Sequence, residues 1–111
     1  MLYKSIRVCN EEIQSRLNKW NDYSEKDNGK LYDQILGLQI QKMRLDKGLG
    51  LQELGDSLNV SFQQIQKYIK GINEISHKKL KLLAEKTDTD LTYFEEPLNA
   101  HKKTITIKRG K

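Results

Sequence analysis

The sequence predicts an all-α fold, with five short helices between residues 31 and 97. Three observations support this class. Apolar residues in this block recur three or four positions apart, which is the spacing of one face of a helix. Gly48 and Gly71 stand just past two such segments, where helices commonly end. No alternating run of β-branched residues, as expected for a strand, competes with this pattern.

Each of the five helices is predicted from its apolar stripe and from a residue suited to begin or end it. The first three are expected at about 31–47, 51–58 and 62–70. The fourth is expected to start after Ser76, and the fifth to run from the N-cap Asp90 to Pro97, which should stop the helical chain. Residues 31–97 therefore form the predicted main domain.

The N-terminal extension, residues 1–30, is predicted to hold one short helix followed by a linker. Asn10 can cap this helix, and Ile13, Leu17 and Trp20 then form an apolar stripe. We expect the stripe to pack against the main domain or against a second subunit. Residues 21–30 are polar and turn-prone, which indicates a linker.

Cys9 and the C-terminal segment are expected to lie outside the core. As the single cysteine, Cys9 cannot form an internal disulfide, and we interpret it as a free surface thiol. Residues 98–111 form a basic tail with five Lys or Arg and no acidic residue. Its cations could attract DNA or only aid solubility. Within it, polar and apolar residues alternate weakly from Thr104 to Ile107, as in a strand. We expect this stretch to be either mobile or an added edge strand.

Composition and motifs argue against a membrane protein or an enzyme. No apolar run approaches the about 20 residues that cross a bilayer, and no secretory signal is evident, so a cytoplasmic location is expected. His77 and His101 have no partner at metal-ligand spacing, and neither a phosphate-binding loop nor a nucleophile elbow is found. We therefore expect no catalysis, no metal and no cofactor. The net charge of +5 favours an acidic partner.

The segment from Leu51 to Gly71 has the pattern of two helices joined by a short turn. Asn59 can adopt the left-handed conformation that ends the first of them. Ser61 is a natural N-cap of the second, and Gln64 three residues later completes a capping box. Val60 and Ile65 occupy the positions of a hydrophobic staple. These local signals agree on one helix start.

One face of the predicted helix 62–70 is expected to remain exposed, because Ile65 and Tyr68 point toward the core. The amides of Gln63 and Gln66 can donate to and accept from an adenine edge. Phe62 could touch a thymine methyl or lie half-buried under the turn. The pattern thus suits a helix that enters the major groove of DNA.

These residues resemble the Cro and phage-repressor type of helix-turn-helix proteins, also called XRE-like regulators. The resemblance covers about residues 33–96 and rests first on segments 36–44, 47–48, 54–55, 59–61, 65–68 and 70–71. Downstream it rests on Ser76, Leu80, Leu83, Ala84 and residues 90–94. It implies a five-helix, lambda-repressor-like domain whose third helix reads double-stranded operator DNA. It also implies a homodimeric transcriptional regulator, and an antitoxin or protein-interaction module of the same fold is the alternative.

The candidate contacts divide into base readers and phosphate binders. The predicted base contacts are Phe62, Gln63, Gln66 and Lys67, although the charge of Lys67 also suits a phosphate. The predicted phosphate contacts are Ser61, Gln64, Lys70, Asn73, Lys78 and, from the first helix of the domain, Lys42 or else Gln39.

The chain departs from the family pattern at three places. Ile69 stands where an acid often pairs with an arginine at position 44, so Arg44 must find another acceptor or be partly solvated. Gly50-Leu51 replaces a common Ser-Gln, which removes a side-chain cap and a phosphate contact. Gly55 replaces a usual alanine, which keeps the helices close and weakens its helix by about 1 kcal/mol.

Overall fold

The fold is seen in a computed structural model that describes residues 2–20 and 25–108, with only the backbone described for 25–27 and 103–108. Every regular element in these ranges is a helix, which confirms the all-α prediction. The elements are α1 (Ile6–Asn18), α2 (Glu25–Lys47), α3 (Leu51–Leu58), α4 (Phe62–Lys70), α5 (His77–Lys86), the 3₁₀ helix η1 (Leu91–Glu95) and α6 (Glu96–Lys108).

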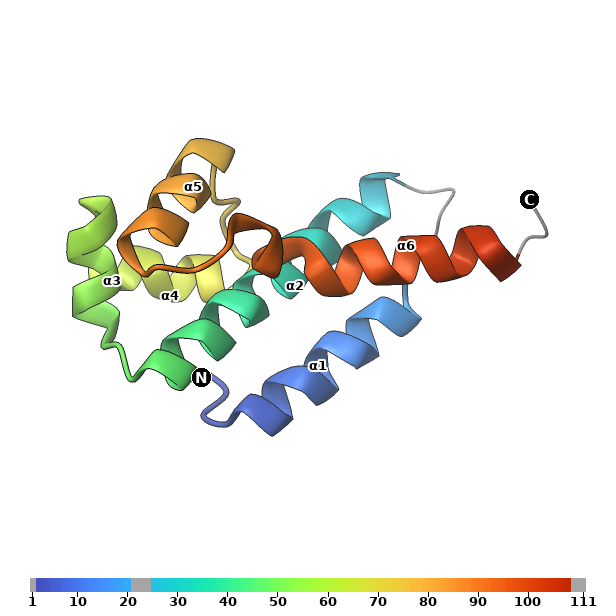
Figure 1. Cartoon of the computed structure of the whole chain (residues 1–111), viewed down its shortest axis with the longest axis horizontal. Coiled ribbons are helices and arrows are strands. Elements are labelled where there is room, and N and C mark those ends of the chain that lie inside the picture. The colour runs from blue at the N-terminus through green and yellow to red at the C-terminus, as the bar shows by residue number, and fades with distance from the viewer. Residues whose placement is uncertain (1, 21–24, 109–111) are drawn as a thin grey trace.

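The long helix α2 runs through the molecule and makes its main helix contacts with α1, α4 and η1. Helices α3, α4 and α5 gather around one end of α2, while α1 and α6 extend along its other part (Figure 1). The fifth predicted helix is the short 3₁₀ helix η1, whose N-cap Asp90 accepts a hydrogen bond from the amide of Thr92. That bond lowers the pKa of the Asp90 carboxyl.

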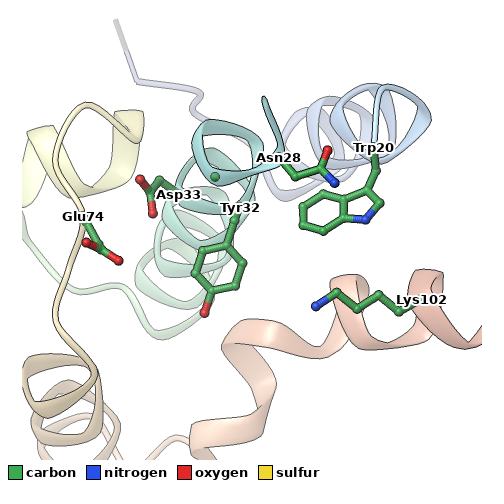
Figure 2. A pocket seen from close by; sticks show the side chains of 7 residues that line it. Trp20, Asn28, Tyr32, Asp33, Glu74 and Lys102 are labelled. Atoms are coloured by element: carbon green, nitrogen blue, oxygen red, sulfur yellow. The ribbon is translucent and has the colours of Figure 1, made fainter. Parts of the chain in front are cut away.

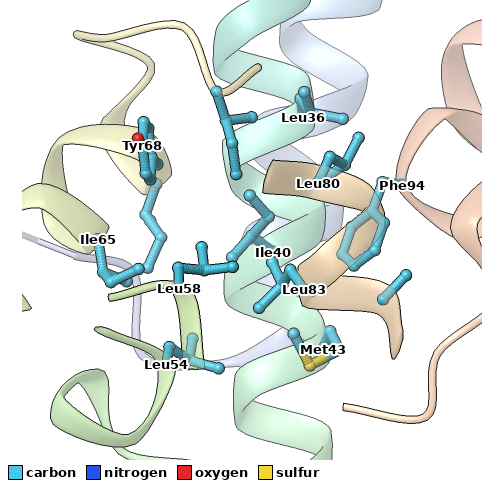
Figure 3. Close-up of a cluster of buried hydrophobic side chains, with 13 residues drawn as sticks. Leu36, Ile40, Met43, Leu54, Leu58, Ile65, Tyr68, Leu80, Leu83 and Phe94 are labelled. Atoms are coloured by element: carbon cyan, nitrogen blue, oxygen red, sulfur yellow. The ribbon is translucent and has the colours of Figure 1, made fainter. Parts of the chain in front are cut away.

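Two faces of α2 are buried, and each belongs to a different hydrophobic cluster. Leu36, Ile40 and Met43 pack with apolar residues of α3, α4, α5 and η1 in the first cluster (Figure 3). Ile35 and Leu38 pack in the second cluster with residues of α1 and α6. Since full burial of one such side chain stabilises a fold by about 1.5–3 kcal/mol, both clusters hold α2 in place.

The N-terminal stripe packs inside the protein. Ile13 and Leu17 are buried in the second cluster, and Trp20 packs at its edge. Cys9 joins them with 0% exposure, so the prediction of a surface thiol is wrong. Ser5, rather than Asn10, caps α1, and Cys9 consequently falls one turn before Ile13 on the buried face. Burial raises the pKa of the Cys9 thiol.

Helix α2 begins at Glu25, within the segment predicted to be a linker. The prediction was wrong for residues 25–30, whose backbone is helical, and residues 21–24 lie outside the described part. Asn28 and Gly29 are poor helix formers, but Asn28 is only 6% exposed. Packing of Asn28 by neighbouring elements therefore offsets the weak helix propensity of this segment.

Pro97 does not stop the chain, because it lies in the first turn of α6. Proline is well tolerated there, since the first amides of a helix have no partner within the helix. Leu98 is buried in the second cluster and anchors α6 against α1 and α2. The backbone of 104–107 is helical, so the predicted edge strand is wrong; 109–111 lie outside the described residues.

A glycine decides how closely α4 approaches α2. A Cβ atom at Gly37 would lie 2.3 Å from the carbonyl oxygen of Ile69 and 2.4 Å from that of Tyr68. Any side chain there would push the backbone of α4 away from α2. In contrast, a Cβ atom at Gly29, in the same helix, would meet nothing within 4 Å.

We predict that Gly37→Ala lowers the free energy of unfolding by about 1–3 kcal/mol, because the added methyl group overpacks a helix contact. The matched Gly29→Ala change should raise stability by up to about 1 kcal/mol, through helix propensity alone. Urea denaturation followed by circular dichroism measures both. Equal effects of the two substitutions would contradict the close contact.

Candidate nucleic-acid interface

The turn between α3 and α4 is built as the sequence predicts. Asn59 adopts the left-handed conformation, with φ of 57°. The amide of Val60 donates to the carbonyl oxygen of Gly55 at 2.9 Å and closes the end of α3. A Cβ atom at Gly55 would lie 2.6 Å from the carbonyl oxygen of Val60, so the missing side chain lets the turn fold back on α3.

Ser61 caps α4, but only one half of the predicted capping box is present. Its hydroxyl oxygen accepts a hydrogen bond of 3.1 Å from the amide of Gln64. The side chain of Gln64 does not return to Ser61 and instead donates to Asn73 Oδ1 at 3.3 Å. Val60 and Ile65 pack in the same apolar cluster, as expected of a staple. The start of α4 is thus tied to the loop that follows it.

The outer face of α4 is open to solvent. Ile65, Tyr68 and Ile69 are buried on the inner side, as expected for the first two. The predicted base contacts Phe62, Gln63 and Lys67 are exposed, and Gln66 is half-buried. With 39% exposure, Phe62 presents part of its ring outward and is not enclosed beneath the turn. The structure therefore brings the four predicted base readers onto one helix.

The loop after α4 adds further exposed groups beside this face. The left-handed Gly71 ends α4, and the amide of Ile72 donates back to the carbonyl oxygen of Lys67 at 3.0 Å. Ile72 is 64% exposed, and the sequence reading overlooked it although an apolar residue between Gly71 and Asn73 was a usable signal. Exposed side chains among the predicted phosphate contacts are Ser61, Lys70, Asn73 and Lys78.

Comparison with protein families decides what this arrangement is. The model of the family described as "Helix-turn-helix" matches residues 40–94, which hold the turn, α4 and the elements packed on them. These residues form a domain of the helix-turn-helix family. The match confirms the resemblance seen in the sequence and the lambda-repressor-like arrangement of its helices.

Curated relatives match the same region. An uncharacterized helix-turn-helix-type transcriptional regulator of Rickettsia conorii is 46% identical over 66 residues, which are 60% of this chain and 53% of that protein. A regulator of the same description from Rickettsia prowazekii is 46% identical over 66 residues, which are 60% of this chain and 51% of that protein. Another from Rhizobium meliloti is 34% identical over 61 residues, which are 55% of this chain and 44% of that protein.

The chain spans about half the length of these curated relatives. No solved structure matched it significantly.

Two positions from α2 do not join the outer face of the helix-turn-helix domain. Gln39 is buried and donates to the carbonyl oxygen of Tyr93 at 2.7 Å, so it cannot contact a phosphate. Lys42 is half-buried with its ammonium 5.8 Å from the centre of the Tyr93 ring, on the side of α2 that faces η1. Its position gives no support to a phosphate contact.

Arg44 donates hydrogen bonds to other acceptors, because position 69 holds isoleucine in place of the acid common in the family. Its Nε donates to Gln41 Oε1 at 2.9 Å, and its terminal nitrogen donates to the carbonyl oxygen of Leu49 at 3.0 Å. It remains half-buried, which confirms the expected partial solvation. The buried Gln41 donates in turn to the carbonyl oxygen of Tyr3, which links the N-terminal segment to the start of the helix-turn-helix.

The first helix of the motif begins without a side-chain cap at Gly50, as predicted. Glu53 compensates in part, because its carboxylate accepts a 2.8 Å hydrogen bond from the Gly50 amide. The carboxylate also lies favourably in the first turn, near the positive end of the helix dipole. The loss of serine at this start is therefore tolerated by the fold.

Other kinds of site find little support in the described ranges. No group of three or more His, Cys, Asp or Glu within them is arranged to hold a metal ion. His77 is exposed at the start of α5, and His101 is half-buried in α6. None of the helices described combines the length and the hydropathy that a bilayer-crossing segment needs.

We predict that Ser61→Ala lowers the free energy of unfolding by about 1 kcal/mol, since the Gln64 amide loses its capping oxygen. Ser61→Asp should retain stability, because a carboxylate caps equally well and suits the helix dipole. Ser15→Ala, in the exposed part of α1, is the control and should change little. The measurement is urea denaturation. If Ser61→Asp proved as unstable as Ser61→Ala, the cap would not depend on that side chain.

Proposed function

We propose that the protein binds double-stranded DNA sequence-specifically, with α4 in the major groove, and that it acts as a transcriptional regulator. The observation that supports this most directly is the open outer face of α4, with Gln63 and Lys67 exposed. Helix α1 packs on α2 and α6 instead of covering that face. The curated relatives are named as transcriptional regulators, which agrees with this role.

The chemistry of the exposed face suits a duplex. The amides of Gln63 and Gln66 can each form a bidentate pair with an adenine edge, and the Phe62 ring can contact a thymine methyl. Lys67 and Lys70 supply positive charge for base edges or phosphates near the end of α4. We infer that the glutamines set the sequence preference, while Lys70 contributes to affinity for any sequence.

The start of α4 offers a second kind of contact. Ser61 satisfies the amide of Gln64, whereas the amides of Phe62 and Gln63 have no partner within the helix. These amides and the helix dipole favour a phosphate oxygen. Asn73, held by Gln64, would place another polar group nearby. We therefore keep Ser61, Gln64, Asn73 and Lys78 as proposed phosphate contacts.

We further propose that two copies bind together in the cytoplasm. One recognition helix reads a short half-site, and a two-fold pair would read two half-sites about 34 Å apart, one turn of the duplex. A pseudo-palindromic operator would follow from that symmetry.

The structure offers little surface for the alternative, an antitoxin or protein-interaction module. Such a module could bind a partner through the stripe of Ile13, Leu17 and Trp20, but Ile13 and Leu17 are buried inside the protein's own second cluster. No other observation in the structure favours this role.

Selection of duplexes from a random pool, repeated at two salt concentrations, tests the proposal. Enrichment of one palindromic sequence is expected, with weaker retention at the higher salt because phosphate binding releases counterions. Its half-site spacing would also test the proposed dimer. A pool that stays random at low salt would overturn sequence-specific binding.

Substitutions should separate specificity from affinity. Gln63→Ala or Gln66→Ala should cost about 1–3 kcal/mol on the selected site and relax the preference at one base pair. Lys70→Ala should weaken all sequences about equally and reduce the slope of log affinity against log salt by about 1. Fluorescence anisotropy with labelled duplexes measures these effects.

Lys86→Ala is the charge-matched control for Lys70→Ala. Lys86 lies in the last turn of α5, at the opposite end from the loop that holds Asn73. Its removal should leave binding nearly unchanged. An equal loss in the two lysine variants would indicate that only total charge matters.

A further inference from the structure

A cavity lies behind the proposed DNA-binding surface, where α1, α2, α6 and the loop between α4 and α5 meet. Its volume is about 470 Å³, and its described wall consists of Trp20, Asn28, Gly29, Tyr32, Asp33, Glu74 and Lys102. Figure 2 shows the carboxylates of Asp33 and Glu74 on one side, the Tyr32 ring in the middle, and Trp20 with Lys102 on the other side. The cavity is large enough for a small organic molecule.

Within the described residues, no ion pair neutralises the acidic side of this cavity, and Lys102 lies at its other end. Neither Asp33 nor Glu74 forms an ion pair with a residue of the described ranges. Asp33 is half-buried, and burial together with the nearby negative charge of Glu74 raises the pKa of its carboxyl. A cation between the half-buried Asp33 and the exposed Glu74 would relieve the repulsion between the two carboxylates.

The aromatic walls offer apolar surface beside the acidic side, and one ring already contacts a cation of the chain itself. The ammonium of Lys102 lies 5.5 Å from the centre of the Trp20 ring, within the range of a cation–π interaction. The hydroxyl of Tyr32 donates to Glu95, so that group is already bonded and the ring is left as an apolar surface. An alkyl chain between Tyr32 and Trp20 would therefore meet apolar faces, with a carboxylate pair at one end.

We propose that this cavity binds a small organic ammonium ion, with its charge at Asp33 and Glu74 and its hydrocarbon part against Tyr32 and Trp20. The carboxylates supply charge-assisted hydrogen bonds, and the rings supply apolar contact for the hydrocarbon part. Lys102 stands at the far end of the cavity, where its own positive charge opposes the entry of a second cation.

A consequence for DNA binding rests on the proposed function. Glu74 directly follows Asn73, a proposed phosphate contact that is joined to Gln64 of α4. A cation held by Glu74 would neutralise a negative charge next to the phosphate backbone and would fix the loop. Occupancy of the cavity is therefore expected to raise DNA affinity about threefold to tenfold.

Trp20 is the single tryptophan of the chain, so its fluorescence reports on the cavity directly. The full chain is titrated with putrescine, n-butylammonium and choline, with n-butanol and potassium chloride at matched ionic strength as controls. A saturable fluorescence change with at least one of the ammonium ions, absent with both controls, is expected.

Three variants locate the binding. Asp33→Asn and Glu74→Gln should each weaken it about tenfold, whereas Lys102→Met should strengthen it because a competing cation is removed. Glu85→Gln, an exposed carboxylate on α5, is the matched control and should leave binding unchanged. Circular dichroism verifies that each variant is folded.

The cation site is overturned if no ammonium ion gives a saturable change, or if Asp33→Asn and Glu74→Gln bind as well as Glu85→Gln. This measurement contains no DNA, so its failure is separate from failure of the proposed function. The coupling is tested afterwards by measuring affinity for the selected duplex with and without the cation. Unchanged affinity at saturation would overturn the coupling alone.

Discussion

The close contact between α2 and the end of α4 sets the position of every proposed DNA-binding group. At Gly37 the two backbones approach so closely that a methyl group cannot fit between them. Gly71 repeats the arrangement one step later, where a Cβ atom would lie 2.7 Å from Gln34. These two glycines hold α4 on the long helix, and its glutamine and lysine side chains are consequently turned toward solvent.

The helix-turn-helix could be predicted because its signals are local. A left-handed Asn59, a capping Ser61 and the two stripes around them determine the turn within a dozen residues. Such preferences act on neighbouring residues and do not need the rest of the fold. The same holds for the caps Ser76 and Asp90, which accept hydrogen bonds from amides two or three residues on. Contacts with DNA remain predictions, since they depend on a partner.

The predictions that were wrong concern features that depend on contacts between distant segments. The early start of α2 and the helix after Pro97 are supported by burial of Asn28 and Leu98, which local propensity does not reveal. Cys9 was misplaced because α1 starts after Ser5 instead of after Asn10, which brings Cys9 into the helix, one turn before Ile13 on the buried face. The cavity is assembled from four separate segments, so the sequence offered no pattern for it.

Because Cys9 lies on the buried face of α1, the reactivity of its thiol can report on detachment of that helix. The thiol has no exposure while α1 is docked, so a reagent can reach it only when α1 separates from α2 and α6. Its rate of alkylation therefore measures how often the N-terminal helix detaches. Because the chain has no other cysteine, that rate is free of contributions from elsewhere and could be followed in the presence of DNA or of a cavity ligand.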